Sequence, residues 1–312
     1  MSALICGSLA YDTIMVFRDR FKNHILPDKI HILNVSFLVP FMRREFGGCA
    51  GNIAYNLKLL GAPGLPMGTV GSDFGTYAAW MDRHKIDRRH IKVLEDAYTA
   101  QAFITTDLDD NQITAFHPGA MNRSNEVAVT EASGVEIGIV APDGRDGMIE
   151  HATQFAESNI RFIFDPGQGM PLFNGAELLR FLDQATWVTL NDYEAQLLQT
   201  RTGQPLDALA RRVEAMIVTR GADGSRIYAR DKIIDIPAVR AREVRDPTGC
   251  GDAYRAGVLY GLMNGFDWET TGRIASLMGS LKVAHAGTQN HRFSRDEFWA
   301  LFQVNFGYTP DR

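Results

Sequence analysis

The feature that most constrains the fold is a regular alternation of short apolar segments and longer helical ones after residue 130. The expected strands are apolar runs over 135–140, 161–164, 187–190 and 216–219. The helical segments beside them lie near 147–158, 176–184 and 193–200. Such alternation specifies a parallel sheet covered by helices on both faces. A β pair across 225–236 and helices near 251–264 and 268–284 complete this half of the chain.

The first half contributes to the same body and adds exposed β-structure. Ala3–Cys6 is a short apolar run typical of a buried strand, and the apolar stripe over 50–60 predicts a helix that ends at Gly61. A strand over 66–70 and a helix over 74–84 follow. Segment 14–46 is rich in β-forming residues, around 30–33 and 35–39 among others, and 101–106 with 112–116 predicts a hairpin. The chain is therefore expected to be one α/β body with a β appendage.

Composition narrows the function classes. The 312 residues are 45% hydrophobic and 22% charged, which excludes a disordered chain, and three widely spaced cysteines, Cys6, Cys49 and Cys250, indicate free thiols. A net charge of −5 argues against nucleic acid as the main partner. No apolar run reaches the roughly 18 to 20 residues of a membrane span, and the N-terminus does not resemble a secretory signal, so we expect a cytoplasmic protein without a membrane partner.

The sharpest candidate site is the segment from Asp246 to Asp252, immediately before an apolar helical stretch. Gly249 and Gly251 allow consecutive backbone N–H groups to turn toward one point, and the helix dipole adds positive potential there. The segment is suited to hold a developing phosphoryl charge, with Asp252 placed to take a proton from an attacking hydroxyl. The alternative is a capped helix with a flexible entry.

Two further clusters precede helices or follow strands. Gly47 and Gly48 permit close approach of a ligand to the backbone, and Asn52 offers both a donor and an acceptor to a sugar diol. Asp12 after the first strand is a carboxylate able to accept two vicinal hydroxyls. Taken alone, each is also explained by an ordinary turn. Neither G-x-x-x-x-G-K-[ST] nor G-x-G-x-x-G occurs, which argues against a P-loop nucleotidase and a dinucleotide-binding unit.

Together these segments resemble the ribokinase-like (PfkB) family of carbohydrate and nucleoside kinases. Six motifs occur in the family's order and cover essentially the whole chain. They are the segments 7–12, 47–52, 70–75, 191–194, 218–224 and 246–252. The resemblance implies a single kinase domain over 1–312, with a Rossmann-like, mostly parallel sheet flanked by helices. It also implies a small β-sheet lid formed by about 14–46 and 98–120, through which a homodimer is an option.

The resemblance also implies roles for individual residues. Asp252 would be the catalytic base, and the N–H groups of Gly249, Cys250 and Gly251 would form the anion hole. The substrate side would comprise Ser8, Asp12, Gly47, Gly48, Asn52, Phe103, Phe116 and Gln168, and the ATP side Asn191, Glu194, Thr219, Gly221 and Gly224. Glu194 would help to place Mg²⁺ through water. Asp246, Thr248 and Gly287 would lie where the family often holds a monovalent cation, with K⁺ as the candidate.

The acceptor is less constrained than the reaction. The aromatic lid residues, the run from Phe116 to Met121 and the segment Asp165–Gln168 look most like bacterial adenosine kinases, which implies phosphorylation of the 5′-hydroxyl of adenosine by ATP. Hydrophobic packing of the lid explains the two phenylalanines equally well. A sugar such as ribose or fructose is the second hypothesis, since it shares the diol. A ligand-binding regulator without catalysis is the third, and a NAD-linked oxidoreductase, which lacks its fingerprint, is the fourth.

The position of Cys250 at a helix N-terminus leads to a separate expectation. The helix dipole favours a thiolate, so we expect Cys250, and less strongly Cys49, to be modified readily.

Overall fold

The largest element of the computed structural model, which describes residues 2–25, 31–109, 111–230 and 232–310, is a nine-stranded sheet. The strands from one edge to the other are β13 (Lys232–Ile236), β12 (Ser225–Ala229), β11 (Ala215–Thr219), β10 (Trp187–Asn191), β9 (Arg161–Phe164), β8 (Val135–Val140), β1 (Ser2–Cys6), β4 (Gly64–Gly71) and β5 (His90–Leu94). From β11 to β5 the strands run parallel, and β12 and β13 form an antiparallel hairpin at one edge. The expected, mostly parallel sheet is confirmed.

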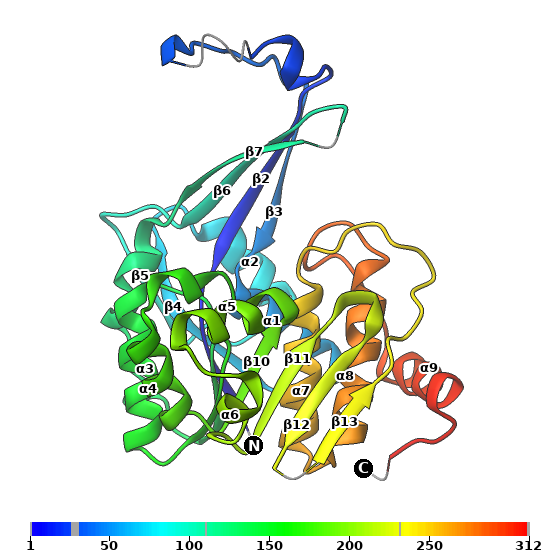
Figure 1. The fold of residues 1–312 in the computed structure, drawn as a ribbon. Helices are drawn as coiled ribbons and strands as arrows, with labels where there is room; N and C mark the ends of the chain where they lie inside the picture. Colours follow the sequence, from blue (N-terminus) through cyan, green and yellow to red (C-terminus); the bar gives the residue numbers. More distant parts are fainter. Residues whose placement is uncertain (1, 26–30, 110, 231, 311–312) are drawn as a thin grey trace.

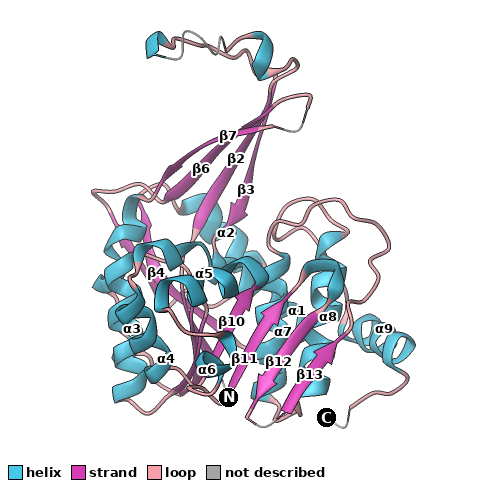
Figure 2. Cartoon of the chain, in the orientation of Figure 1, coloured by secondary structure: helices cyan, strands magenta, loops and turns pink. Residues whose placement is uncertain are grey.

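Helices cover both faces of this sheet (Figures 1 and 2). One face carries α1 (Cys49–Leu60), α2 (Gly75–Arg83), α7 (Cys250–Met263), α8 (Trp268–Val283) and α9 (Arg295–Phe306). The other carries α3 (Arg145–Glu157), α4 (Gly175–Gln184), α5 (Asp192–Thr202) and α6 (Leu206–Ala210). Strand β1 shows why both faces are apolar: Ala3 and Ile5 enter one core, and Leu4 and Cys6 enter the other.

A separate four-stranded sheet projects from the body (Figure 1). Its strands, in order, are β3 (Phe41–Gly47), β2 (Ala10–Val16), β6 (Ala100–Thr106) and β7 (Gln112–His117). The expectation of a small β-sheet built from two early segments is confirmed, including the hairpin of β6 and β7. We call this sheet the lid sheet.

The expected strands around 30–39 are not formed. Val16 pairs with Phe41, so the register of β2 on β3 makes the intervening residues a connection rather than strands. Residues 31–40 contain no strand, and Ile30 lies outside the described residues. The segment has β-forming residues but connects two strands that pair with each other, so its β-propensity alone does not make it a strand.

The other helices and strands agree with the expected ranges to within a few residues, with additions. Sequence patterns missed β5, α6 and α9. The charged stretch after residue 80 has exposed or half-buried charged side chains around the buried Met81 and Ile86, and the chain then enters the edge strand β5. Short 3₁₀ turns occupy Phe21–Asn23, Gly119–Glu126, Val129–Glu131, Gly167–Leu172 and Gly221–Asp223.

In the described part of the chain, no helix combines the length and apolar character that crossing a bilayer requires. All three cysteines are free thiols, as predicted, with Cys6 buried and the other two partly buried.

The close approach of α7 to α8 depends on Gly257. A Cβ added there would lie 2.5 Å from the Ala275 Cα, so Gly257→Ala forces the two helices apart. We expect the free energy of unfolding to fall by about 1–3 kcal/mol in denaturant titrations. Gly75→Ala in α2 is the matched control, since a Cβ there meets no atom within 4 Å. It should leave stability unchanged or raise it by up to about 1 kcal/mol; equal effects of both changes would contradict this packing.

Candidate active site

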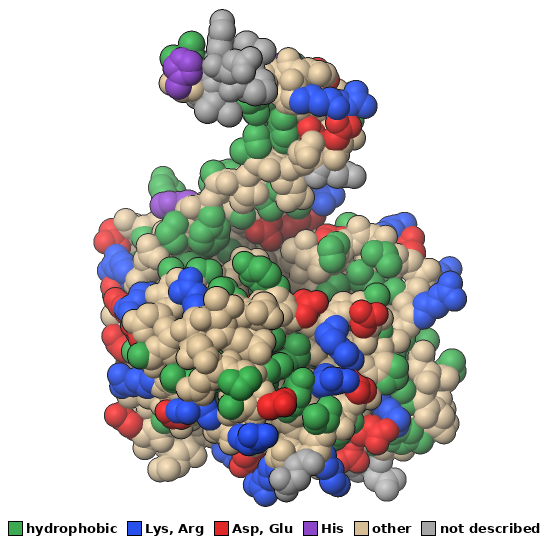
Figure 3. All heavy atoms as spheres, viewed as in Figure 1, with side chains coloured by type: hydrophobic (Ala, Val, Ile, Leu, Met, Phe, Trp, Pro, Cys, Tyr) green, Lys and Arg blue, Asp and Glu red, His purple; other side chains and the backbone are tan. Residues whose placement is uncertain are grey.

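The candidate residues gather beyond the carboxyl ends of the parallel strands, where open α/β sheets bind ligands. Ser8 follows β1, Asp165 follows β9, and Asn191 and Thr219 end β10 and β11. The N-termini of α1 and α7 open at the same edge, below the lid sheet. Figure 3 shows acidic side chains gathered in the recess where the lid sheet meets the body.

A direct hydrogen bond joins Asn52 on α1 to Asp252 on α7. Asn52, buried in the first turn of α1, donates from Nδ2 to Asp252 Oδ2 over 2.8 Å. Loss of hydration raises the pKa of Asp252 to about 6, although the Asn52 hydrogen bond and Arg255 oppose the shift. Asp252 is thus a carboxylate at neutral pH with more basicity than an exposed aspartate, as suits a general base.

A buried hydrogen-bond chain fixes Asn52, and the sequence analysis missed it. Gln289 Nε2 donates to Asn52 Oδ1 over 3.0 Å and to the Tyr77 hydroxyl over 2.6 Å. Tyr77 in turn donates to the carbonyl of Gly47 over 2.9 Å, and Trp80 Nε1 donates to Gln289 Oε1. Because Gln289 occupies the Asn52 oxygen with a donor, the Asn52 amide nitrogen is directed at Asp252. Gln289 lies in an irregular segment, so no sequence pattern marks it.

The loop before α7 has the geometry expected of an anion site, with one difference. Gly249 adopts a left-handed φ of 77°, and the first amides of α7 have no partner in a preceding helical turn. The N–H of Cys250, expected in the anion hole, donates to the carbonyl of Pro247 over 3.1 Å. Gly251 follows it at the helix start. Of the three amides, that of Cys250 is already engaged within the loop.

The expectation of reactive thiols at the helix N-termini is wrong for this structure. Burial raises the pKa of Cys250 to about 11, and the charges of Asp246 and Asp252 add to the increase. Burial, with Asp252 and Asp165 nearby, also raises the pKa of Cys49. Desolvation and neighbouring carboxylates outweigh the helix dipole, so both groups stay thiols at neutral pH.

The lid side of the recess is acidic. Asp12 on β2 is paired with Glu45 on β3, and Asp246 is close enough to act on it. Burial and these two charges raise the pKa of Asp12 to about 6. A Cβ at Gly47 would lie 2.7 Å from Asp12 Oδ2, and one at Gly48 would lie 2.5 Å from the carbonyl of Ser8. Gly47 therefore keeps the backbone close to Asp12, and Gly48 keeps it close to Ser8.

Ser8 and the two lid phenylalanines have different surroundings. Ser8 Oγ accepts the N–H of Cys49, so it caps the start of α1. Phe116 is paired with Ala102, which is paired with Asp12, so Phe116 shares the face of the lid sheet on which Asp12 lies. Phe103 is paired with Thr13 and lies on the opposite face. The structure therefore brings only Phe116 to the side of Asp12.

A buried ion pair lies under the strand ends. Arg255 on α7 binds Asp165 through two hydrogen bonds of 2.8 and 3.0 Å, and Glu194 Oε2 is 3.8 Å from the guanidinium. All three side chains are buried. Burial, with the Asp165 charge, raises the pKa of Glu194. Arg255 was missed, although a lone cation in the apolar run of α7 is a visible signal. Gln168, expected on the substrate side, lies three residues beyond Asp165 and is exposed.

Asn191 and Glu194 form the start of α5. Asn191 Oδ1 accepts the Glu194 N–H over 2.7 Å, and Glu194 Oε2 accepts the Asn191 N–H over 2.8 Å. This capping box holds the Glu194 carboxylate at the carboxyl edge. The nearby loop after β11 turns at Gly221 and Gly224, both with positive φ. A Cβ at Gly224 would lie 2.0 Å from the carbonyl of Ile236, so this position requires glycine.

No preformed metal cluster is present in the described residues, which contain no group of three or more His, Cys, Asp or Glu able to hold an ion. For Mg²⁺, Asp165 and Glu194 supply carboxylates of the right chemistry at the strand ends. They fit a metal that is bound mainly by nucleotide phosphates and approached through water. Each oxygen of Glu194 already accepts a hydrogen bond from Asn191.

The expected monovalent-cation residues lie together but already have partners. Asp246 Oδ1 accepts the N–H of Thr248 and Oδ2 accepts the N–H of Gly287, over 2.9 and 2.8 Å. The Lys282 ammonium donates to the Asp246 carbonyl. As arranged here, these residues do not fit an additional cation.

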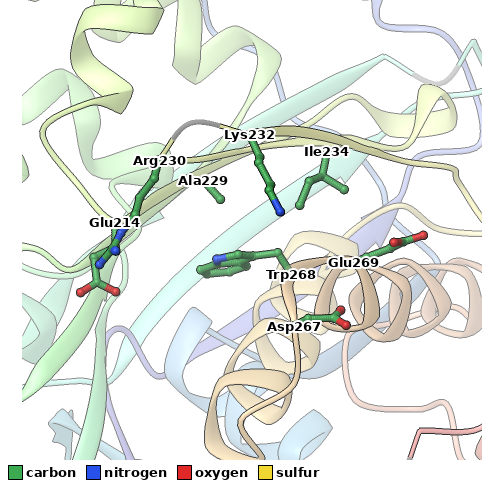
Figure 4. Close-up of a pocket in the computed structure, with 8 residues that line it drawn as sticks. All are labelled: Glu214, Ala229, Arg230, Lys232, Ile234, Asp267, Trp268 and Glu269. Carbon is green, nitrogen blue, oxygen red and sulfur yellow. The ribbon is translucent and has the colours of Figure 1, made fainter.

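One hollow lies away from this edge. Figure 4 shows it beside Trp268, lined by residues from the β12–β13 turn and the start of α8. Glu214, which lines it, precedes β11, so the hollow of about 490 Å³ opens at the amino ends of the strands. It is separate from the candidate active site.

Comparison with known proteins shows which family the chain matches. The chain matches the pfkB family carbohydrate kinase model over residues 10–294. It is 34% identical over 260 residues to a nucleoside kinase of Methanocaldococcus jannaschii, covering 83% of this chain and 85% of that protein. A nucleoside kinase of Methanothermobacter thermautotrophicus is 31% identical over 305 residues, covering 96% and 98%.

A solved structure is more similar still. The nucleoside kinase of Burkholderia thailandensis in complex with inosine is 54% identical, with a TM-score of 0.90, and the match covers 99% of this chain and 100% of that one. The chain belongs to the pfkB family of carbohydrate kinases and is a phosphotransferase that acts on a hydroxyl group.

Proposed function

We propose that this protein is a nucleoside kinase that transfers the γ-phosphoryl group of ATP to the 5′-hydroxyl of adenosine, giving AMP and ADP. The observation that carries the proposal is the Asp252 carboxylate at the start of α7, hydrogen-bonded to Asn52 and raised in pKa to about 6. A base of this strength beside helix N-terminal amides suits the deprotonation of an alcohol during phosphoryl transfer.

The nucleoside as acceptor rests on the lid side of the recess. The Asp12 carboxylate can accept the two vicinal hydroxyls of a ribose, and Asn52 adds a donor and an acceptor. Phe116 is 53% exposed on the same sheet face as Asp12, which leaves an aromatic surface for a base. Relatives that share a third to a half of the sequence are named nucleoside kinases, and one has been solved with inosine.

The proposed reaction is an in-line displacement. The 5′-oxygen forms a bond to the γ-phosphorus as the bond to the β–γ bridging oxygen breaks, and the 5′-hydroxyl proton passes to Asp252. Backbone amides at Gly249 and Gly251 stabilise the charge that develops on the transferred group. Asn52 orients the base, and the Gln289–Tyr77 pair keeps Asn52 in place.

The nucleotide side relies on few charged groups. Thr219, Gly221 and Gly224 would contact the nucleotide through the loop after β11, and Asn191 fixes Glu194 beneath it. Mg²⁺ bound to the phosphates would neutralise their charge, and Glu194 would orient its waters. Arg255 offsets one of the two negative charges of Asp165 and Glu194 and so weakens their repulsion of the incoming phosphates.

Replacing the base tests the mechanism. Asp252→Asn keeps the shape of the side chain but removes its proton affinity, so kcat should fall roughly 10²-fold or more while adenosine binding is largely retained. Kinetics give kcat, and calorimetric titration gives Kd. Asp296→Asn, in the exposed first turn of α9, is the matched control and should leave kcat unchanged. Normal turnover in Asp252→Asn would refute the assignment of the base.

The pH profile should report both acidic groups. Asp252 and Asp12 have pKa values raised to about 6, and both must be ionised, so kcat/KM is full above these values and falls as the pH drops through them. The logarithmic slope at low pH should approach 2, and in Asp12→Asn it should be close to 1 because one group is removed. A wild-type profile that stays flat down to about pH 4 would contradict both roles.

A substrate panel tests the acceptor. ADP release should be highest with adenosine, followed by other purine nucleosides, and should be weak with ribose, fructose and their phosphates. A free sugar lacks the base that would contact Phe116. Its kcat/KM should therefore be at least about 10²-fold lower than that of adenosine. Phe116→Ala should raise KM for adenosine and leave ribose unaffected. Preference for a free sugar would favour the sugar-kinase hypothesis.

A further inference from the structure

Lys282 is an ammonium buried beside the anion-hole loop, and the proposed reaction does not use it. It lies in the last turn of α8 and is 0% exposed. Its Nζ donates to the carbonyl of Asp246 over 2.8 Å and to the carbonyl of His285 over 3.1 Å. A buried charge is tolerated only when it is paired or hydrogen-bonded, so these two carbonyls are needed to keep the ammonium in place.

The two acceptors belong to different segments. Asp246 begins the loop that leads to Gly249 and α7, and His285 lies just after the end of α8. The N–H groups of Arg245 and Asp246 also donate to the carbonyl of Val283, so the loop is docked on the C-terminus of α8. Carbonyls at a helix end lack intrahelical partners and carry partial negative charge, which favours a cation there.

The same place is where the family resemblance implies a monovalent cation, around Asp246, Thr248 and Gly287. Each oxygen of the Asp246 carboxylate accepts an N–H from one of the other two residues, and the Asp246 carbonyl accepts from Lys282. Potassium and an ammonium carry the same charge and both take carbonyl oxygens as partners. We propose that the Lys282 ammonium replaces the monovalent cation in this protein, making phosphoryl transfer independent of K⁺.

The ammonium acts through the loop rather than on the substrate. By joining Asp246 to His285 it fixes the segment that carries Gly249 and Gly251, so Lys282 is a positioning residue for the proposed reaction. Asp246, Asp252 and Cys250 are close enough to act electrostatically on it, and its own charge acts on His291, whose pKa is lowered to about 3 by burial and by the charges of Lys282 and His285. Its positive charge therefore offsets carboxylates next to the anion site.

The wild-type protein gives the first test. Its kcat with ATP, Mg²⁺ and adenosine should change by less than about twofold when KCl is replaced by choline chloride at equal ionic strength. Stimulation by K⁺ of about tenfold or more, absent with Li⁺, would overturn the proposal, because it would require a cation site that Lys282 does not fill.

A variant that empties the position gives the second test. Lys282→Ala should lower kcat about tenfold or more in choline chloride, and about 0.1 M NH₄Cl or KCl should restore much of it. LiCl should not. Lys282→Met fills the volume without a charge and should show the loss without the rescue. Lys58→Ala, an exposed lysine of α1, is the control and should behave as wild type. A Lys282→Ala variant with normal kcat in choline would contradict the role.

Thermal unfolding provides a readout that does not depend on turnover. The Tm of Lys282→Ala should rise on changing choline to K⁺ or NH₄⁺ at constant ionic strength, whereas the Tm of wild type should not. The inference rests on the proposed function only for the activity measurements. If adenosine is not phosphorylated but the Tm pattern is as stated, the proposed function fails and the cation replacement stands. If Lys282→Ala does not fold, the comparison of wild-type kcat in KCl and in choline chloride tests the cation replacement by itself.

Discussion

The hydrogen bond between Asn52 and Asp252 is the interaction on which the rest of the site depends. It joins the first turns of α1 and α7, which are 200 residues apart in the chain. Helix α1 follows directly from β3 of the lid sheet through Gly48, so the position of α1 also sets the position of the acceptor side. One partly buried contact therefore relates the acceptor side of the recess to the base. The chain from Gln289 through Tyr77 to Gly47 makes that contact rigid.

Electrostatics in the recess follow from an excess of carboxylates over cations. Asp12, Glu45, Asp246 and Asp252 lie on the open side, and Arg255 and Lys282 lie beneath it, where each is hydrogen-bonded. Raised pKa values at Asp12 and Asp252 are the consequence of crowding and partial burial. The net charge of −5 is compatible with a nucleotide-binding protein in this arrangement, because backbone amides and Mg²⁺ neutralise phosphates without a basic surface.

Sequence patterns predicted what depends on local periodicity and turn chemistry. The alternation after residue 130 predicted β8 to β11 and the helices α3, α4 and α5 to within two residues, because buried parallel strands and amphipathic helices have distinct apolar periods. The glycine-rich starts of α1 and α7 made Asn52 and Asp252 candidates for a different reason, because glycines before a helix let a ligand approach the backbone closely. Pairing choices were not predictable: residues 31–40 read as β-structure, yet the register of β2 on β3 makes them a connection.

Contacts between distant segments left no local signal. Gln289 and Lys282 act from an irregular stretch and from the end of a helix, and only the fold brings them to Asn52 and Asp246. The expectation of a reactive Cys250 thiol failed for a related reason. The helix start is visible in the sequence, whereas the burial that raises the pKa of the thiol is not.

The most direct measurement of the central claim is a ³¹P NMR time course of the protein with ATP, Mg²⁺ and adenosine. The account predicts that the γ-phosphorus signal of ATP is replaced by ADP and 5′-AMP signals growing in equal amounts. Release of inorganic phosphate without a nucleoside monophosphate, or a phosphate attached to the 2′- or 3′-oxygen, would contradict it.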